Sequence, residues 1–225
     1  MFIAVVILVV LCVGLFYASY SISAGIYLKS LCSAPADTGS IALTFDDGVD
    51  PHITIKVLET LKKHRVKATF FIIGEKAARY PELVKRITEE GHVIGNHSYY
   101  HKWYFPMQPT SAIIREMTEC DRTLSGICGY GIQFFRPPFG VTNPLVARAV
   151  KKMKMVPVGW SLRSLDTVGQ PVETVCNRVL RRVKPGDVIL LHDNRKDAGL
   201  LLDKILNETE RRGLKAVTIK ELFNI

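Results

Sequence analysis

Hydrophobic and polar positions divide the chain into an uncharged N-terminal stretch and a longer region of mixed periodicity. Residues 1–28 contain no Lys, Arg, Asp, Glu or His, and the first charged side chain is Lys29. An apolar stretch of this length exceeds the roughly 20 residues that cross a bilayer as a helix. It lacks the basic residues that open a signal peptide, although small residues between Ala18 and Ala24 leave cleavage open. We therefore predict that residues 1–28 are a transmembrane anchor or an uncleaved signal, and that residues 29–40 are a linker.

Short β-prone runs alternate with amphipathic helical runs from residue 41 onward. The predicted strands cover residues 41–45, 68–73, 92–95, 133–135, 155–159 and 187–191. The predicted helices cover residues 51–64, 81–90, 110–124, 143–152, 172–183 and 197–212, and two short elements at residues 216–218 and 219–223 close the chain. This alternation implies parallel strands with helices packed outside them. We therefore expect one α/β domain over residues 41–225, built as an α/β barrel or a wound sheet.

Composition describes a globular protein with a basic surface. Hydrophobic residues make up 48% of the chain and charged residues 23%, which excludes a disordered protein. The net charge of +9 favours anionic surroundings but identifies no ligand. The five cysteines show no C-x-x-C spacing, and their odd number argues against a complete disulfide framework. Cys120 and Cys128 could pair, but we favour the interpretation that they are small buried apolar residues.

Ionisable side chains follow five of the predicted strands. These clusters are Asp46 with Asp47, residues 96–101, Arg136, residues 160–166, and His192 with Asp193. Because the carboxyl ends of parallel strands meet on one face, we expect the five clusters to converge there and form a site.

Asp46 and Asp47 are adjacent carboxylates that end the first strand. Asp-Asp-Gly is ordinary turn chemistry, so a simple turn is one interpretation. The other is a functional pair, because neighbouring carboxylates stay ionised together only beside a cation or a hydrogen-bond donor.

His97 and His101 are four residues apart, so on a helical turn both imidazoles would point to one side. Such a pair alone is often a surface feature. With a carboxylate from another strand end it supplies two nitrogens and one oxygen, a set suited to zinc, cobalt or another borderline divalent ion. The remaining histidines, His52, His64 and His92, are interpreted as structural or solvated.

His192 and Arg136 each have a structural and a functional interpretation. His192 follows an apolar strand, where it is either a packed core histidine or a general acid tuned by a carboxylate such as Asp166. Arg136 precedes two prolines that hold its backbone rigid, and we expect its partner to be a carboxylate of the same site.

Four motifs in order resemble those of the polysaccharide deacetylase (NodB homology) family, also called carbohydrate esterase family four. They are Thr44-Phe45-Asp46-Asp47-Gly48, His97-x-x-x-His101, Arg136-Pro-Pro-Phe-Gly140 and Leu190-Leu191-His192-Asp193. The resemblance covers residues from about 41 to about 220 and implies a distorted (β/α) barrel with fewer than eight regular strands.

The resemblance implies a metal-dependent hydrolase that removes N- or O-acetyl groups from a sugar polymer. Asp47, His97 and His101 would bind one divalent metal ion, usually zinc, with cobalt or nickel as alternatives. Asp46 would be the general base, His192 the general acid, Arg136 the residue that holds Asp46, and Asp166 the partner of His192. Phe139, Trp160 and Leu190 would contact the substrate, Phe139 through its backbone N–H at the oxyanion and Leu190 at the acetyl methyl.

The chain departs from the family pattern at three positions. Phe139 stands where the family often has Tyr, and the contact attributed to this position is mainly through the backbone. Arg163 and Thr167 replace the first Asp and the Trp of an Asp-x-x-Asp-Trp motif, whereas Asp166 is kept. The two replacements change residues expected to shape the acetyl and sugar pocket.

Membrane orientation is weakly marked in the sequence. Lys29 favours a cytoplasmic C-terminus, but a cell-surface glycan such as peptidoglycan lies outside the cytoplasm. We therefore expect a membrane-anchored protein whose catalytic domain is extracytoplasmic, on the periplasmic or outer side of the inner membrane. No sequence pattern sets the oligomeric state, and a monomer is expected.

Two other functions fit parts of the sequence. A catalytically impaired glycan-binding module on the same fold would bind metal or glycan without turnover. A metallophosphoesterase or nucleic-acid enzyme would need more carboxylates for two metals or an interleaved basic and aromatic surface. The chain shows neither feature, so we expect no nucleic-acid partner.

Overall fold

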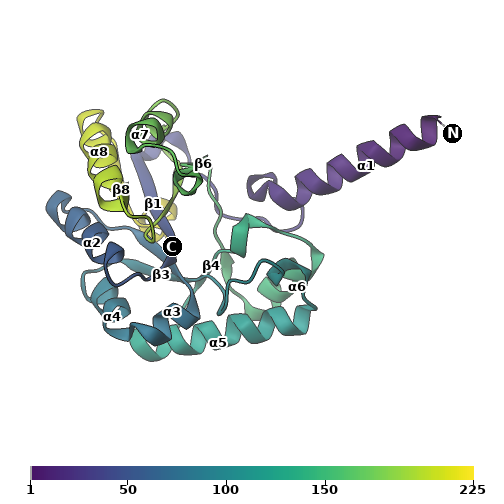
Figure 1. Ribbon diagram of the computed structural model, residues 1–225, viewed down its shortest axis with the longest axis horizontal. Coiled ribbons are helices and arrows are strands. Elements are labelled where there is room, and N and C mark those ends of the chain that lie inside the picture. Colours follow the sequence, from purple (N-terminus) through teal and green to yellow (C-terminus); the bar gives the residue numbers. More distant parts are fainter. Residues whose placement is uncertain (1) are drawn as a thin grey trace.

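Parallel strands form a curled sheet at the centre of the fold (Figure 1). The computed structural model describes residues 2–225. Neighbouring strands follow the order β5-β4-β3-β2-β1-β7-β6, and β8 pairs with the beginning of β1. The strands are β1 (Ser40–Gly48), β2 (Thr69–Ile72), β3 (Val93–Asn96), β4 (Phe134–Phe135), β5 (Val156–Pro157), β6 (Leu162–Arg163), β7 (Val188–His192) and β8 (Lys215–Val217). This distorted, open barrel confirms the fold class predicted from the sequence.

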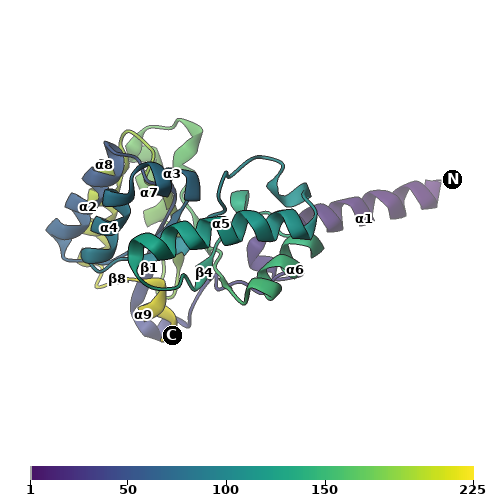
Figure 2. The same cartoon turned by 90° about the horizontal axis from the view of Figure 1, so that it is seen from below.

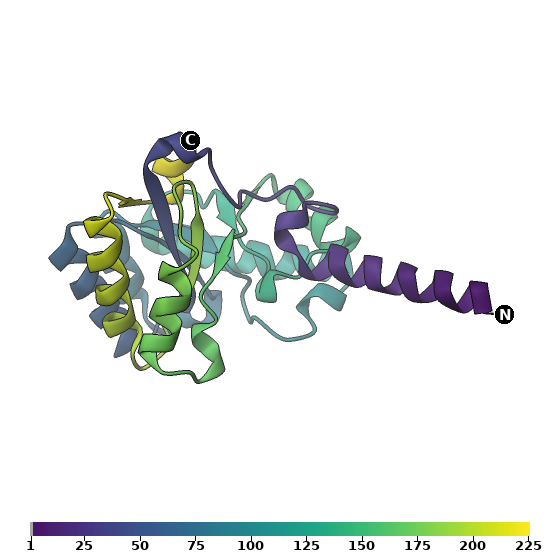
Figure 3. The same cartoon turned by 90° about the horizontal axis from the view of Figure 1, so that it is seen from above.

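Helices cover the outside of the curled sheet (Figures 1 and 2). They are α2 (Ile53–His64), α3 (Gly74–Arg79), α4 (Pro81–Glu89), α5 (Thr110–Cys128), α6 (Pro144–Met153), α7 (Val172–Leu180) and α8 (Ala198–Arg211). A short last helix, α9 (Ile219–Phe223), lies beside β1 near the amino ends of the strands, where Ile219 and Leu222 are buried (Figure 3). The opposite, carboxyl ends of the strands are therefore the face left for a site.

The pleat of β1 sorts its side chains between the two sides of the sheet. Ile41, Leu43 and Phe45 belong to the large core shared with the outer helices. Ala42 belongs to the smaller inner cluster, and Thr44 is also buried. Successive side chains of a strand point to opposite faces, so an apolar run buried on both faces is what a central parallel strand requires.

Helix α1 (Phe2–Tyr20) extends away from the barrel (Figures 1 and 3). It is long and apolar enough to cross a membrane, with a mean hydropathy of 2.8. Beyond it, Leu31 pairs with Val158 after β5, and Ser33 pairs with Asp187 before β7. The segment that follows α1 therefore contacts strands on both sides of the open barrel. The division into an anchor, a linker and a catalytic domain stays a prediction.

Most predicted elements lie within a few residues of the observed ones, with four differences. Helix α3 and strand β6 were not predicted, α5 continues to Cys128, and α7 ends at Leu180. Cys120 is buried and Cys128 half-buried, and both are free thiols. The interpretation of these two cysteines as packed residues rather than a disulfide is confirmed.

Candidate active site

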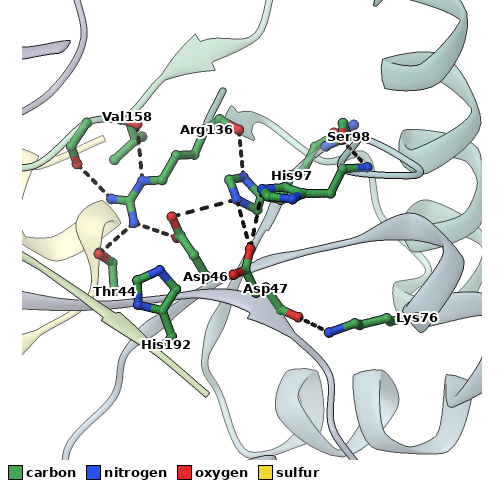
Figure 4. A network of polar contacts seen from close by, with 12 residues as sticks. Thr44, Asp46, Asp47, Lys76, His97, Ser98, Arg136, Val158 and His192 are labelled. Atoms are coloured by element: carbon green, nitrogen blue, oxygen red, sulfur yellow. Dashed lines mark hydrogen bonds and ion pairs between the residues drawn. The ribbon is translucent and has the colours of Figure 1, made fainter. Parts of the chain in front are cut away.

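Sheet register brings the predicted site residues together at the carboxyl ends of the strands. Asp46 of β1 lies opposite His192 of β7 in the parallel ladder. Asn96 of β3 lies opposite Phe135 of β4, so the residues that follow, His97 and Arg136, leave the sheet side by side. Figure 4 shows these side chains pointing toward one another. The convergence predicted from the strand ends is therefore present in the structure.

Asp47, His97 and His101 form a group that can hold a metal ion. One ligand atom from each of the three residues lies within 4.8 Å of the others. Asp47 Oδ1 is 3.5 Å from His97 Nε2 and 3.4 Å from His101 Nε2. Tetrahedral zinc ligands at about 2.0–2.1 Å from the ion stand roughly 3.3 Å apart. The observed separations and the donor set of two nitrogens and one oxygen therefore fit a zinc-sized ion with a position left for water or substrate.

The backbone at these ligands is not helical, so the predicted helical turn over residues 97–101 is wrong. Ser98 and His101 have φ values of 65° and 52°, in the left-handed region that few non-glycine residues adopt. Ser98 Oγ accepts a hydrogen bond from the His101 N–H at 3.0 Å, and Asn96 Oδ1 accepts one from the Ser98 N–H at 2.9 Å. A turn held by side-chain hydrogen bonds, rather than a helix, directs both imidazoles to Asp47.

Charge and protonation at the three residues suit metal ligation. Burial opposes ionisation of Asp47, but the hydrogen bond and charge of His97 and the charges of His101 and His192 outweigh it, so its pKa is well below the usual range. Burial, reinforced by the charge of His97, lowers the pKa of His101 to about 4, which leaves its imidazole neutral near pH 7. His97 Nδ1 lies 2.8 Å from the Arg136 carbonyl oxygen, which can only accept, so Nδ1 donates and Nε2 is free to ligate.

Arg136 holds Asp46 in a separate, buried interaction. Its Nη1 donates to Asp46 Oδ1 at 2.7 Å and to Thr44 Oγ1 at 2.8 Å, and its Nη2 donates to the Gly159 carbonyl at 2.7 Å. The other carboxylate oxygen, Asp46 Oδ2, lies 3.7 Å from His97 Nε2. Asp46 is thus fixed through one oxygen while the second faces the metal-ligand group. The two adjacent carboxylates take different partners, as expected if they have different roles.

His192 is paired with Asp166 on the other side of the site. His192 Nδ1 donates to Asp166 Oδ1 at 2.7 Å, and the His192 backbone N–H donates to Oδ2 at 2.9 Å. Ser164 Oγ donates to the same carboxylate at 3.0 Å. Burial lowers the pKa of His192, but the hydrogen bond and charge of Asp166 outweigh this effect and raise it above its ordinary value. The imidazole is therefore oriented and biased toward its protonated form.

Side chains around these groups line a pocket of about 240 Å³. The exposed Phe139 ring packs on His101, with centroids 4.6 Å apart, and the backbone of Phe139 has a φ of 59°. Trp160 and Leu190 form part of the wall, together with Arg163 and Thr167. All three positions that depart from the family pattern therefore lie in the pocket itself.

Three residues near the site were given no individual role in the sequence analysis. Lys76 Nζ donates to the Asp47 carbonyl at 2.6 Å, and Asn96 supports the His97–His101 turn. Asp193 is buried, accepts from Thr54 Oγ1 at 2.6 Å, and burial raises its pKa to about 7. Asn96 and Asp193 stand directly beside the predicted histidines, which is the signal that could have found them. Lys76 lies on α3, a helix absent from the sequence prediction.

Comparison with known proteins agrees with this geometry. The sequence model of the family described as Polysaccharide deacetylase matches residues 33–158. A peptidoglycan-N-acetylglucosamine deacetylase of Bacillus cereus is 37% identical over 203 residues, which cover 85% of this chain and 70% of that protein.

Solved structures show the same fold. The crystal structure of the Bc1960 peptidoglycan N-acetylglucosamine deacetylase, in complex with a benzamide compound, superimposes with a TM-score of 0.80 at 36% identity, covering 86% of this chain and 92% of that one. BA3943 of Bacillus anthracis, described as a pseudoenzyme of carbohydrate esterase family four, has a TM-score of 0.80 at 25% identity, covering 85% of this chain and 67% of that one. The family model matches more than half of the chain, and the Bacillus cereus relative is similar over most of it. The chain therefore belongs to the polysaccharide deacetylase family.

Proposed function

We propose that the chain is a metal-dependent hydrolase that removes N-acetyl groups from a cell-surface glycan containing N-acetylglucosamine, with peptidoglycan as its substrate. The observation that carries the proposal is the three-residue metal-ligand group flanked by two separately held groups, Asp46 and His192, in one pocket. The N-acetylglucosamine deacetylases among the relatives support the substrate class.

The proposed metal is zinc, held by Asp47, His97 and His101, with cobalt or nickel able to replace it. When bound, the ion polarises the acetyl carbonyl and makes water easier to deprotonate. Two imidazole nitrogens and one carboxylate oxygen, with an open position, are typical of catalytic zinc sites.

The two flanking groups would carry the protons. Asp46, positioned by Arg136, takes a proton from the attacking water as the new C–O bond forms at the acetyl carbon. The backbone N–H of Phe139 donates to the carbonyl oxygen as negative charge develops there. His192 then gives its proton to the sugar nitrogen as the C–N bond breaks, which releases acetate and a free amine. Asp166 keeps His192 protonated for this step.

The pocket walls would select the acetyl group. Leu190 offers an apolar surface for the methyl, and Trp160 offers a ring face for the sugar. A pocket of about 240 Å³ has room for an acetamido group and part of one sugar ring. Arg163 lies with its guanidinium 6.0 Å from the Trp160 ring centroid and would contact the polymer beyond the acetyl group.

We further propose that α1 anchors the chain in a membrane and that residues 41–225 form the catalytic domain on the extracytoplasmic side. Helix α1 has the length and hydropathy of a span, and its side chains are exposed until its last turn. A glycan substrate outside the cytoplasm favours this location.

Acetate release by the full chain tests the activity. The chain in detergent micelles is supplied with zinc, cobalt or nickel and incubated with N-acetylglucosamine oligomers, peptidoglycan or a phosphoester. We expect acetate from the glycans and no phosphate from the phosphoester. Asp46→Asn should lower kcat by at least about 100-fold, while Asp37→Asn, at an exposed carboxylate remote from the pocket, should leave it unchanged.

The same assay separates the proposed hydrolase from a catalytically impaired glycan-binding module. Such a module would bind the oligomers without releasing acetate under any of the three metals. The pseudoenzyme of the same fold shows that the family fold alone does not imply turnover. Asp46, Asp47, His97, His101 and His192 are all present here in mutually consistent positions, which favours the hydrolase.

A further inference from the structure

Charge is distributed unevenly between two parts of the molecule. Residues 1–36 and 91–165 contain ten Lys and Arg residues and three acidic ones, Glu116, Glu119 and Asp121. The rest of the chain contains 20 Lys and Arg residues and 18 acidic ones, so these two segments carry +7 of the net charge of +9. The two segments include α1, α5 and α6. Helices α1 and α6 lie on the same side of the molecule, and α5 runs from α6 across to α3 and α4 (Figures 1 and 2). Most of the net positive charge is therefore on the part of the chain that includes α1 and α6.

The end of α1 is attached to this side by hydrogen bonds. The Thr142 N–H donates to the Ser19 carbonyl at 2.9 Å, and Thr142 Oγ1 donates to the Ala18 carbonyl at 3.3 Å. The next residue, Asn143, caps α6 and donates from Nδ2 to the Pro106 carbonyl at 2.6 Å. These contacts hold the loop of residues 102–107 and the start of α6 in place relative to α1.

The loop of residues 102–107 presents large apolar side chains to solvent. Trp103 is 71% exposed, Met107 is 70% exposed and Tyr104 is also exposed, whereas Phe105 between them is fully buried. Phe105 fixes the loop while its neighbours point outward. Exposed Trp and Tyr beside a membrane span are typical of residues that sit at the bilayer interface.

Helix α6 adds exposed positive charge next to this loop. Arg148, Lys151, Lys152 and Lys154 are all exposed. No acidic residue lies on α6 or on the loop to offset them. An anionic phospholipid surface attracts basic residues within about 10 Å of it, and the aromatic side chains of the loop can enter its headgroup layer.

We propose that the loop of residues 102–107 and helix α6 rest on an anionic phospholipid bilayer, the one in which α1 is inserted. This inference rests on the proposed membrane anchoring by α1. Docking on the bilayer fixes the orientation of the domain as well as its location. The loop begins beside His101, so the pocket opens close to the bilayer and glycan strands near the membrane are the substrates within reach.

Fluorescence quenching by brominated lipids tests the docking, because the chain has only two tryptophans. The full chain is reconstituted into vesicles of phosphatidylcholine, with or without phosphatidylglycerol, in which the acyl chains carry bromine. Trp160→Phe leaves Trp103 as the reporter, and Trp103→Phe leaves Trp160. We expect strong quenching of Trp103 and weak quenching of Trp160, with phosphatidylglycerol increasing the former and high salt reversing the increase.

Charge variants test the role of α6. Lys151→Gln with Lys152→Gln should lower the ratio of docked to undocked molecules by about fivefold for each lysine. Lys62→Gln with Lys63→Gln is the matched control, an exposed pair at the end of α2 in the nearly neutral rest of the chain, and should leave quenching unchanged.

Three outcomes would overturn the docking proposal. If the chain floats with the vesicles but Trp103 is quenched no more than Trp160, docking is refuted and the anchor is left intact. A Trp103 emission shift with a soluble glycerol-phosphate polymer, without lipid quenching, assigns the surface to an anionic polymer instead. Failure of the chain to float with vesicles removes the anchor as well. Acetate release from soluble oligomers reports on the proposed activity independently of all three.

Discussion

Replacing Arg136 by methionine tests how the structure holds Asp46. The guanidinium is fully buried and donates to Asp46, to a threonine hydroxyl and to two backbone carbonyls. Methionine fills much of the volume but leaves the buried carboxylate unpaired. Removing one partner of a buried ion pair costs about 3–5 kcal/mol, a large part of the roughly 5–15 kcal/mol that stabilises a typical domain. We therefore expect Arg136→Met to lower the free energy of unfolding by about 3–5 kcal/mol.

A double-mutant cycle isolates the pair from the other contacts of Arg136. Unfolding by urea is measured in detergent micelles with a chelator present, so that metal binding makes no contribution. Adding Asp46→Asn to Arg136→Met removes the unpaired charge, and we expect a coupling free energy of at least about 2 kcal/mol. Arg136→Lys, which keeps the charge but loses the planar fork, should cost less than methionine. Additive costs within about 0.5 kcal/mol would refute the claim that Arg136 holds the Asp46 carboxylate.

Three further predictions follow from other contacts. Asp166→Asn removes the hydrogen bond and charge that raise the pKa of His192, so the alkaline limb of the kcat profile should move to lower pH and kcat should fall by about 10- to 100-fold; an unmoved limb would argue against His192 as the acid. Burial lowers the pKa of His92 to about 4, so its contribution to stability is present above about pH 6.5 and is lost as the pH falls toward 4. Between about pH 7 and pH 5 this loss is about 2 kcal/mol, and urea unfolding of His92→Asn should lack it; an unchanged pH dependence would contradict this. Gly140 has a φ of 69°, and a Cβ there would lie 2.2 Å from the Trp160 ring. Gly140→Ala should therefore lower the free energy of unfolding by about 1–3 kcal/mol and raise KM without changing metal content. A fully active, equally stable variant would show that the ring moves freely.

The architecture could be predicted from the sequence because its signals are local. The apolar run of residues 41–45 and the helical periodicity of residues 51–64 each reflect burial that the element itself specifies. Helix α3 has only six residues, too few to show a period, and β6 pairs through two residues whose position depends on β7. Both elements are set by tertiary contacts, so the sequence alone did not predict them.

The site could be predicted by residue type but not by local geometry. Asp46, Arg136 and His192 meet because parallel strands end on one face, a rule that applies to any such fold. The turn that directs His97 and His101 depends on left-handed backbone conformations at non-glycine residues and on side-chain hydrogen bonds from Asn96 and Ser98. Spacing alone suggested a helical turn, because four-residue separation is the commonest way to align two histidines.

Metal binding by histidine variants tests the central claim most directly. The chelator-treated full chain is titrated with zinc by calorimetry, and bound metal is then counted after dialysis. We predict one zinc per chain for the unaltered protein, and a loss of affinity greater than about 100-fold for His97→Ala or His101→Ala. His52→Ala, at an exposed histidine outside the pocket, should bind as the unaltered protein does. One zinc per chain at unchanged affinity in both His97→Ala and His101→Ala would contradict the account.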